Sequence, residues 1–273
     1  MVIEKKWLRM FWAVALVLFL VAISTAGSSI VVAGHNGNCP VDLSNIPVLN
    51  YHKVDNVRHS LSIAPREFEK QMAYLAENGY HTITPDQLIS YIKQGSSLPE
   101  KPIMITFDDG YADNYTNAYP ILMKYGFTAT IFVVTNLVGQ DPRFMTWDQA
   151  REMEQNGITF GSHTANHRPL TNLPLPQVAA ELTESFAKME KELGQPPRFF
   201  AYPTGTHNPQ VEEAVYNAGY QAAFSIRYGL VGPESNLFAL ERIPIFSCQK
   251  TFRSFFVRLN GAPLLERLGF IKN

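Results

Sequence analysis

Side chains that can do hydrolytic chemistry gather at three points of this sequence. Asp108 and Asp109 directly follow the apolar stretch 102–107, and His163 and His167 stand four residues apart after another such stretch. His52 follows a third. Each has an ordinary explanation when taken singly. Asp-Asp-Gly is a common turn, paired histidines occur in surface loops, and a lone histidine is often a core residue.

Taken together, these groups indicate a metal centre. Two imidazoles and one carboxylate are a ligand set that a catalytic Zn²⁺ takes while a fourth position stays open for water. The second aspartate is then left over and can act as a base. The combination predicts a metal-dependent hydrolase if the fold brings the three points together.

The rest of the chain predicts such a fold. Short strands alternate with amphipathic helices, and the strands are apolar throughout, which is typical of parallel strands covered on both faces. We expect a single-domain distorted (β/α) barrel of about seven parallel strands, in which the chemistry lies at the C-terminal ends of the strands. The stretch 226–239 is irregular, which leaves closure of the barrel there open. The expected strands are 46–52, 80–84, 102–107, 128–134, 158–162, 198–202, 221–225 and 240–246, and the expected helices are 65–78, 85–94, 117–125, 147–156, 176–193 and 209–219.

Two motifs resemble a known family. TFDDGYADNY (106–115) and SHTANH (162–167) are similar to the motifs of the polysaccharide deacetylases, the NodB-homology group of carbohydrate esterase family 4. The resemblance extends from IPVLNYHKVDN (46–56) to about residue 246. It implies a metal-dependent hydrolase that removes acetyl groups from N-acetylglucosamine polymers. By the same resemblance Asp108 is the general base, and Asp109, His163 and His167 bind the metal, Zn²⁺ or else Co, Ni or Mn.

Two departures from the family pattern point to a subgroup. Much of the family has an arginine two residues before the proline of FFAYPTG, where Ala201 stands here, and no histidine follows His207. With PVL-x-YH near the start, these features resemble the circularly permuted branch that deacetylates poly-β-1,6-N-acetylglucosamine. The resemblance then makes His52 the general acid, with His207 as the competing candidate. It leaves open which group orients Asp108.

Three further residues are expected to bind the substrate. The backbone N–H of Thr204 is the expected oxyanion donor, again by resemblance, and Tyr111 and Tyr202 are candidates for stacking on sugar rings. Trp147 is a third candidate for stacking, but we expect it to pack in the core instead. We expect Asn114 to cap the helix that follows it, with a bond to a sugar hydroxyl as the alternative.

The same sequence leaves other functions to consider. A glycoside hydrolase needs two carboxylates about 5–9.5 Å apart across one bond, which the neighbours Asp108 and Asp109 do not readily provide. Peptidoglycan or chitin oligosaccharides are alternative substrates. A catalytically weak polysaccharide-binding relative is the remaining alternative, which the complete ligand set opposes and the missing arginine mildly favours.

Composition excludes several classes of protein. The 273 residues are 46% hydrophobic with a net charge of −1, which rules out a disordered chain and disfavours a nucleic-acid binder. Two cysteines exclude a disulfide-dense scaffold, and whether Cys39 and Cys248 pair is left open. We expect a monomer whose partner is the neutral acetylated polysaccharide.

The N-terminus has the composition of an export signal. Lys5, Lys6 and Arg9 precede the apolar run 10–23, and the small residues Ser24 and Ala26 follow it. We expect residues 1–26 to be a signal peptide or a membrane anchor, with cleavage favoured. Residues 27–45 are the expected linker and 46–273 the deacetylase domain. This organisation predicts a secreted or extracytoplasmic protein that contacts the membrane only through its N-terminal segment.

Overall fold

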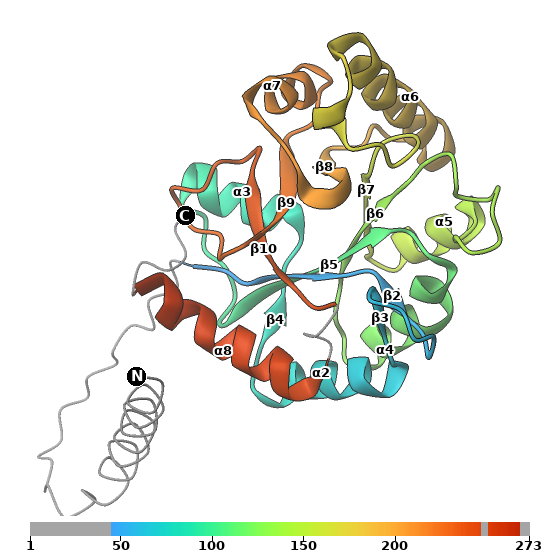
Figure 1. The fold of residues 1–273 in the computed structure, drawn as a ribbon. Coiled ribbons are helices and arrows are strands. Elements are labelled where there is room, and N and C mark those ends of the chain that lie inside the picture. The colour runs from blue at the N-terminus through green and yellow to red at the C-terminus, as the bar shows by residue number, and fades with distance from the viewer. Residues whose placement is uncertain (1–44, 247–250, 268–273) are drawn as a thin grey trace, which may run out of the picture. The chain divides into compact units, whose positions relative to one another are not determined.

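The computed structural model describes residues 45–246 and 251–267. Within them, seven parallel strands close into a barrel, as predicted (Figure 1). The barrel strands are β1 (Val48–Tyr51), β5 (Pro102–Asp109), β6 (Thr130–Val133), β7 (Thr159–Ser162), β8 (Phe199–Ala201), β9 (Ala222–Tyr228) and β10 (Leu240–Pro244).

Strand β1 closes the ring because it pairs on both sides. Leu49 lies opposite Ile105 of β5 and opposite Ile243 of β10, and both pairings are parallel. The first and last barrel strands of the described chain are therefore neighbours. The short β4 (His81–Thr82) pairs only with the start of β5. A separate pair, β2 (Lys53–Val54) and β3 (Ser62–Ile63), follows β1.

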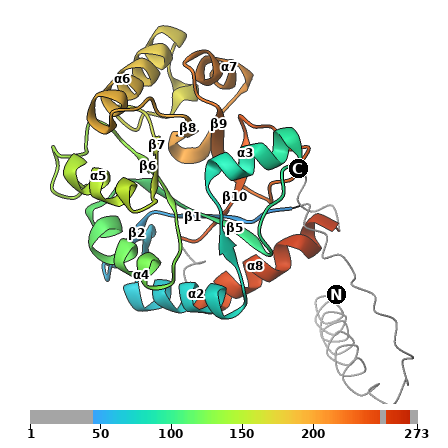
Figure 2. The same cartoon turned by 180° about the vertical axis from the view of Figure 1, so that it is seen from behind.

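Helices surround the barrel, as the view from behind also shows (Figure 2). Two of them begin where the sequence predicted, with capping boxes formed by Thr84 with Gln87 and by Thr146 with Gln149. The helices are α2 (Pro65–Glu77), α3 (Pro85–Gln94), α4 (Tyr119–Lys124), α5 (Trp147–Gln155), α6 (Leu175–Leu193), α7 (Pro209–Asn217) and α8 (Phe252–Arg267), with 3-10 turns at Leu170–Asn172 and Pro203–Gly205.

Alternation along the strands separates two apolar cores. On β5, Met104 belongs to one cluster with Phe132 and Phe224, while the adjacent Ile105 belongs to a second cluster with residues of α2 and α5. Successive side chains of a strand point to opposite faces, so the first cluster fills the barrel and the second lies under the helices. The same alternation decides where the polar residues at the end of β5 point.

Three elements differ from expectation. The helix expected over 117–125 begins earlier, as a π-helical turn, Asn114–Ala118, that continues into α4. Strand β9 runs to Tyr228, into the stretch expected to be irregular, and this extension lets β10 pair and the barrel close. Helix α8 was not predicted. It packs on α2, where Phe252 and Phe255 contact the ring of Tyr74 (Figure 1).

The predicted signal or anchor (1–26), the predicted linker apart from Asn45, and both cysteines lie outside the described residues. Among the residues that are described, no helix combines the length and apolar character that crossing a bilayer requires.

Candidate metal centre and active site

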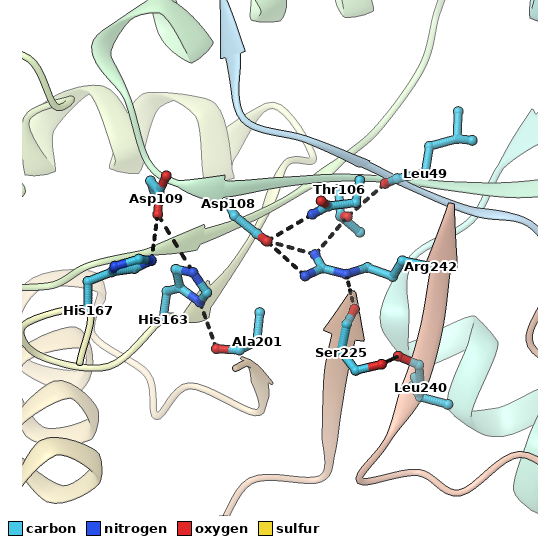
Figure 3. A network of polar contacts seen from close by, with 11 residues as sticks. Leu49, Thr106, Asp108, Asp109, His163, His167, Ala201, Ser225, Leu240 and Arg242 are labelled. Carbon is cyan, nitrogen blue, oxygen red and sulfur yellow. Dashed lines mark hydrogen bonds and ion pairs between the residues drawn. The ribbon is translucent and has the colours of Figure 1, made fainter. Parts of the chain in front are cut away.

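The two aspartates at the end of β5 have different surroundings, because the side chains of adjacent strand residues point in opposite directions. Asp108 is 1% exposed and points into the barrel, whereas Asp109 turns toward the histidines of the β7 loop (Figure 3). The chain must turn sharply after them. Asp109 and Gly110 both have positive φ, and a Cβ on Gly110 would lie 2.8 Å from Cγ1 of Val133. Only glycine fits there, which explains the third letter of the Asp-Asp-Gly motif.

Asp109, His163 and His167 converge on one point, as the sequence predicted. Oδ1 of Asp109 lies 3.2 Å from Nε2 of His167 and 3.6 Å from Nε2 of His163 (Figure 3). One ligand atom from each residue lies within 4.8 Å of the others. Such a group of two nitrogens and one oxygen matches the donors that Zn²⁺ and similar divalent ions take.

The surroundings of the triad suit a cation. Nδ1 of His163 lies 2.7 Å from the carbonyl oxygen of Ala201, a contact that places the ring proton on Nδ1 and leaves the lone pair of Nε2 facing Asp109. Burial lowers the pKa of His163 to about 3, so this ring is neutral. Burial, together with the charge of Asp108, raises the pKa of Asp109 to about 7. A bound divalent cation would offset the penalty on that buried carboxylate, so the residues present fit a metal ion.

Asp108 is held by Arg242, a residue that the sequence analysis missed. Nη1 and Nη2 of Arg242 donate to Oδ1 and Oδ2 of Asp108 at 2.7 and 2.8 Å, and Asn50 Nδ2 donates to Oδ2 at 2.8 Å (Figure 3). Burial would raise the pKa of Asp108, but the charge of Arg242 and its two hydrogen bonds outweigh that effect and hold the pKa well below its usual range. The carboxylate is therefore charged and fixed in orientation.

Arg242 is itself fully buried and anchored to the barrel wall. Its Nε donates to the carbonyl oxygen of Ser225 at 2.7 Å, and Nη1 also donates to Thr106 Oγ1 at 3.2 Å. An arginine at an inward-facing position of the expected strand 240–246 was the available signal, because a buried charge needs a buried partner. The open question of what orients Asp108 is answered by Arg242 and Asn50.

His52 lies in the same site. Its ring packs edge-on against Phe246 at a centroid distance of 4.8 Å, and Nδ1 is buried with no partner among the described residues. Burial lowers the pKa of His52 to about 4, although the charge of Asp108 acts to raise it. The competing His207 instead lies with Nδ1 2.7 Å from Glu212 and stacks on Tyr202.

Tyr111 and Thr204 are two further residues that the sequence predicted to bind substrate. Tyr111 bonds Asp109 through its hydroxyl, and its ring lies between Phe144 and the ammonium group of Lys53. Thr204 is exposed on the turn after β8 with φ of 61°. Tyr111 therefore reaches the site through its hydroxyl, while its ring is already in contact with Phe144 and Lys53. The substrate-binding roles of Tyr111 and Thr204 stay predictions.

Two expectations need correction, and one is confirmed. Tyr202 has no exposed surface, its hydroxyl donates to Phe238 and its N–H to Phe224, so its ring has no free face for a sugar. Asn114 is not a helix cap, because its buried Nδ2 donates to the carbonyl oxygen of His52 at 2.7 Å. Trp147 packs in the core, as expected.

Comparisons with known proteins agree with this geometry. A family model described as polysaccharide deacetylase matches residues 95–223. YxkH of Bacillus subtilis (strain 168), whose name assigns it to the polysaccharide deacetylases, is 35% identical over 202 residues, which are 74% of this chain and 72% of that protein. A Staphylococcus aureus (strain MSSA476) protein named poly-beta-1,6-N-acetyl-D-glucosamine N-deacetylase is 28% identical over 72% of this chain and 77% of its own length. The structure of the Streptococcus pyogenes deacetylase PplD in complex with acetate is similar with a TM-score of 0.71 at 28% identity, covering 74% of this chain and 93% of that one.

Proposed function

This chain belongs to the polysaccharide deacetylase family, and we propose that it is an exported, metal-dependent N-deacetylase of poly-β-1,6-N-acetylglucosamine. One observation carries the proposal. Neighbouring carboxylates have separate surroundings: Asp109 faces two neutral imidazoles, and Asp108 faces a guanidinium. A hydrolase that uses a metal and a base needs this division, because the base must not be consumed as a ligand.

In the proposed mechanism Asp109, His163 and His167 hold the metal ion. When bound, such an ion lowers the pKa of water and polarises the acetyl carbonyl. Asp108 accepts the proton of the attacking water, and Arg242 with Asn50 keeps its carboxylate in one orientation. The backbone N–H of Thr204 stabilises the negative charge that develops on the carbonyl oxygen.

His52 is the proposed proton donor to the departing glucosamine nitrogen. Its low pKa means that the free enzyme carries a neutral ring at pH 7. Negative charge that develops beside the ring during attack would favour its protonation, as the charge of Asp108 already does in part. Asn114 supports this role by holding the carbonyl group of His52.

Two arguments favour poly-β-1,6-N-acetylglucosamine as the polymer. The S. aureus relative is named for that substrate, and its match spans most of both chains. The proposed acid also directly follows the first barrel strand, close to where the resemblance to that branch places it. Export is proposed from the basic, apolar and small-residue order of residues 1–26.

Acetate release tests the proposal. The full-length chain, purified in mild detergent and loaded with Zn²⁺, is assayed side by side on poly-β-1,6-N-acetylglucosamine, chitin oligomers and peptidoglycan. We expect the fastest release from the first polymer, and loss of turnover with retention of zinc in Asp108→Asn. Faster release from another polymer would reassign the substrate, and polymer binding without acetate release would favour a binding protein. Sequencing the N-terminus of the protein recovered outside the cytoplasm tests export and cleavage.

A further inference from the structure

The loop that carries both histidine ligands has an unfavourable backbone. Thr164 and His167 have φ of 68° and 58°, in the left-handed region that non-glycine residues rarely adopt. Such a conformation costs free energy and persists only where surrounding contacts determine it. His167 is the more exposed of the two histidines, so its backbone conformation depends on the contacts of the loop around it.

Some of the contacts that hold this loop come from the loop itself and from the residues that follow β6. The N–H of His167 donates to Thr164 Oγ1 at 2.9 Å. The N–H groups of Thr135 and Asn136, after β6, donate to the carbonyl oxygens of Thr164 and Ala165. These contacts fix the first half of the loop, and they leave Asn166, the residue before His167, to be held by something else.

Glu181 of α6 holds Asn166 at two points. Its Oε2 accepts the backbone N–H of Asn166 at 2.9 Å, and its Oε1 accepts Asn166 Nδ2 at 3.1 Å. The carboxylate is buried, with 4% of the residue exposed, although both of these donors are uncharged. Burying a carboxylate against neutral donors costs free energy, so the position of Glu181 calls for a role that offsets this cost.

Asn136 also holds the side chain of Asn166. Oδ1 of Asn166 accepts a hydrogen bond from Asn136 Nδ2 at 3.0 Å, and that same nitrogen donates to Glu184 Oε1 at 2.6 Å. The backbone N–H and both polar side-chain atoms of Asn166 are thus committed to protein partners. Although Asn166 is exposed, these hydrogen bonds hold the loop in place.

We propose that Glu181 is a positioning residue for the metal centre: through Asn166 it holds the loop in the conformation that aims Nε2 of His167 at Asp109. The inference rests on the proposed metal site, and it concerns metal affinity before catalysis. Residues that support metal ligands in this way typically contribute 10–100-fold to metal affinity.

Calorimetric titration of the chelator-treated full-length chain with ZnCl₂ tests the inference. We expect Glu181→Gln to bind Zn²⁺ at least about 10-fold more weakly than the wild type. Glu190→Gln is the matched control, because it removes the same charge from an exposed position of the same helix, and we expect it to bind like the wild type. A purely structural role would lower the unfolding temperature in chelator and leave Zn²⁺ affinity unchanged.

Asn166→Ala keeps the test decisive if Glu181→Gln folds poorly. It removes the Nδ2 and Oδ1 contacts but keeps the backbone N–H, so we expect a smaller loss of affinity. Wild-type Zn²⁺ affinity in Glu181→Gln, or in Asn166→Ala if only that variant folds, would overturn the inference and leave the proposed function intact. Absence of Zn²⁺ binding by the wild type would instead refute the metal site itself, and with it both proposals.

Discussion

Asp108 and Arg242 lie 134 positions apart in the sequence and form a two-point ion pair inside the barrel. The pair joins β5 to β10, which are not adjacent strands, because β1 lies between them. Asn50 of β1 completes the arrangement by donating to the same carboxylate. The proposed base on β5 is thus oriented by one polar residue from β1 and one from β10.

Arg242→Lys should lower kcat for acetate release on the order of 10²-fold with little change in KM. Lysine keeps the charge but cannot donate to both carboxylate oxygens in a fixed plane, so the base loses its orientation. Arg198→Lys is the control, because Arg198 makes a two-point pair with Asp86 at the exposed surface. Equal kcat in Arg242→Lys and the wild type would show that Asp108 needs no such support.

His52→Ala and His207→Ala distinguish the two candidate acids. We expect His52→Ala to lower kcat by about 10²–10⁴, the usual contribution of a positioned proton donor. His207→Ala should remain within about twofold of the wild type, since that ring faces Glu212 and Tyr202. The reverse order of effects in steady-state kinetics would exchange their roles.

Removal of metal should abolish acetate release, and added Zn²⁺ should restore it. The same ion should stabilise the fold, because it binds the folded triad and not the dispersed residues of the unfolded chain. At about 100 times Kd the gain is about 2.7 kcal/mol, which appears as a rise in Tm. A variant with His167→Ala should lose most of this rise. Activity that survives exhaustive chelation would contradict the metal mechanism.

Gly110→Ala should destabilise the fold by more than Gly95→Ala. Both glycines have positive φ, but a Cβ on Gly110 meets Val133 at 2.8 Å while one on Gly95 meets no atom within 4 Å. Gly95→Ala therefore reports the backbone cost alone, about 1 kcal/mol, and Gly110→Ala adds steric overlap beside Asp109. Free energies of unfolding from urea titration measure the difference, and equal values would mean that Val133 moves aside freely.

Tyr220 should make stability fall in alkaline solution. Burial raises the pKa of Tyr220 to about 12, so the folded chain keeps the phenol proton where the unfolded chain, with a pKa of about 10, releases it. Because the unfolded state then binds fewer protons, stability decreases between about pH 10 and 12 by up to about 1.4 kcal/mol per pH unit. Tyr220→Phe should show a shallower decrease in urea titrations across this range. Replacement of the exposed Tyr216 by Phe should not, and identical slopes in all three proteins would refute the assignment.

The barrel and the convergence of Asp109, His163 and His167 could both be predicted from the amino-acid sequence. Apolar strands and amphipathic helices are recognised from local patterns. Asp109 lies two residues after a predicted strand, and His163 and His167 lie on the loop that follows another. Because parallel strands of a barrel end at one rim, local motifs at strand ends are sufficient to predict that these side chains meet.

The contacts that hold the rest of the site could not be predicted in this way, because they join residues that are far apart in the sequence. The partner of Asp108 and the contact of Asn114 with His52 depend on β1 lying beside β5 and β10. The burial of Tyr202 depends on its contacts with Phe224 of β9 and with Phe238. The spacing of apolar and polar residues along one element carries no information about such long-range contacts. Arg242 is far from Asp108 along the chain, and it becomes the partner of that carboxylate because a charge buried inside a barrel must be paired with one buried across from it.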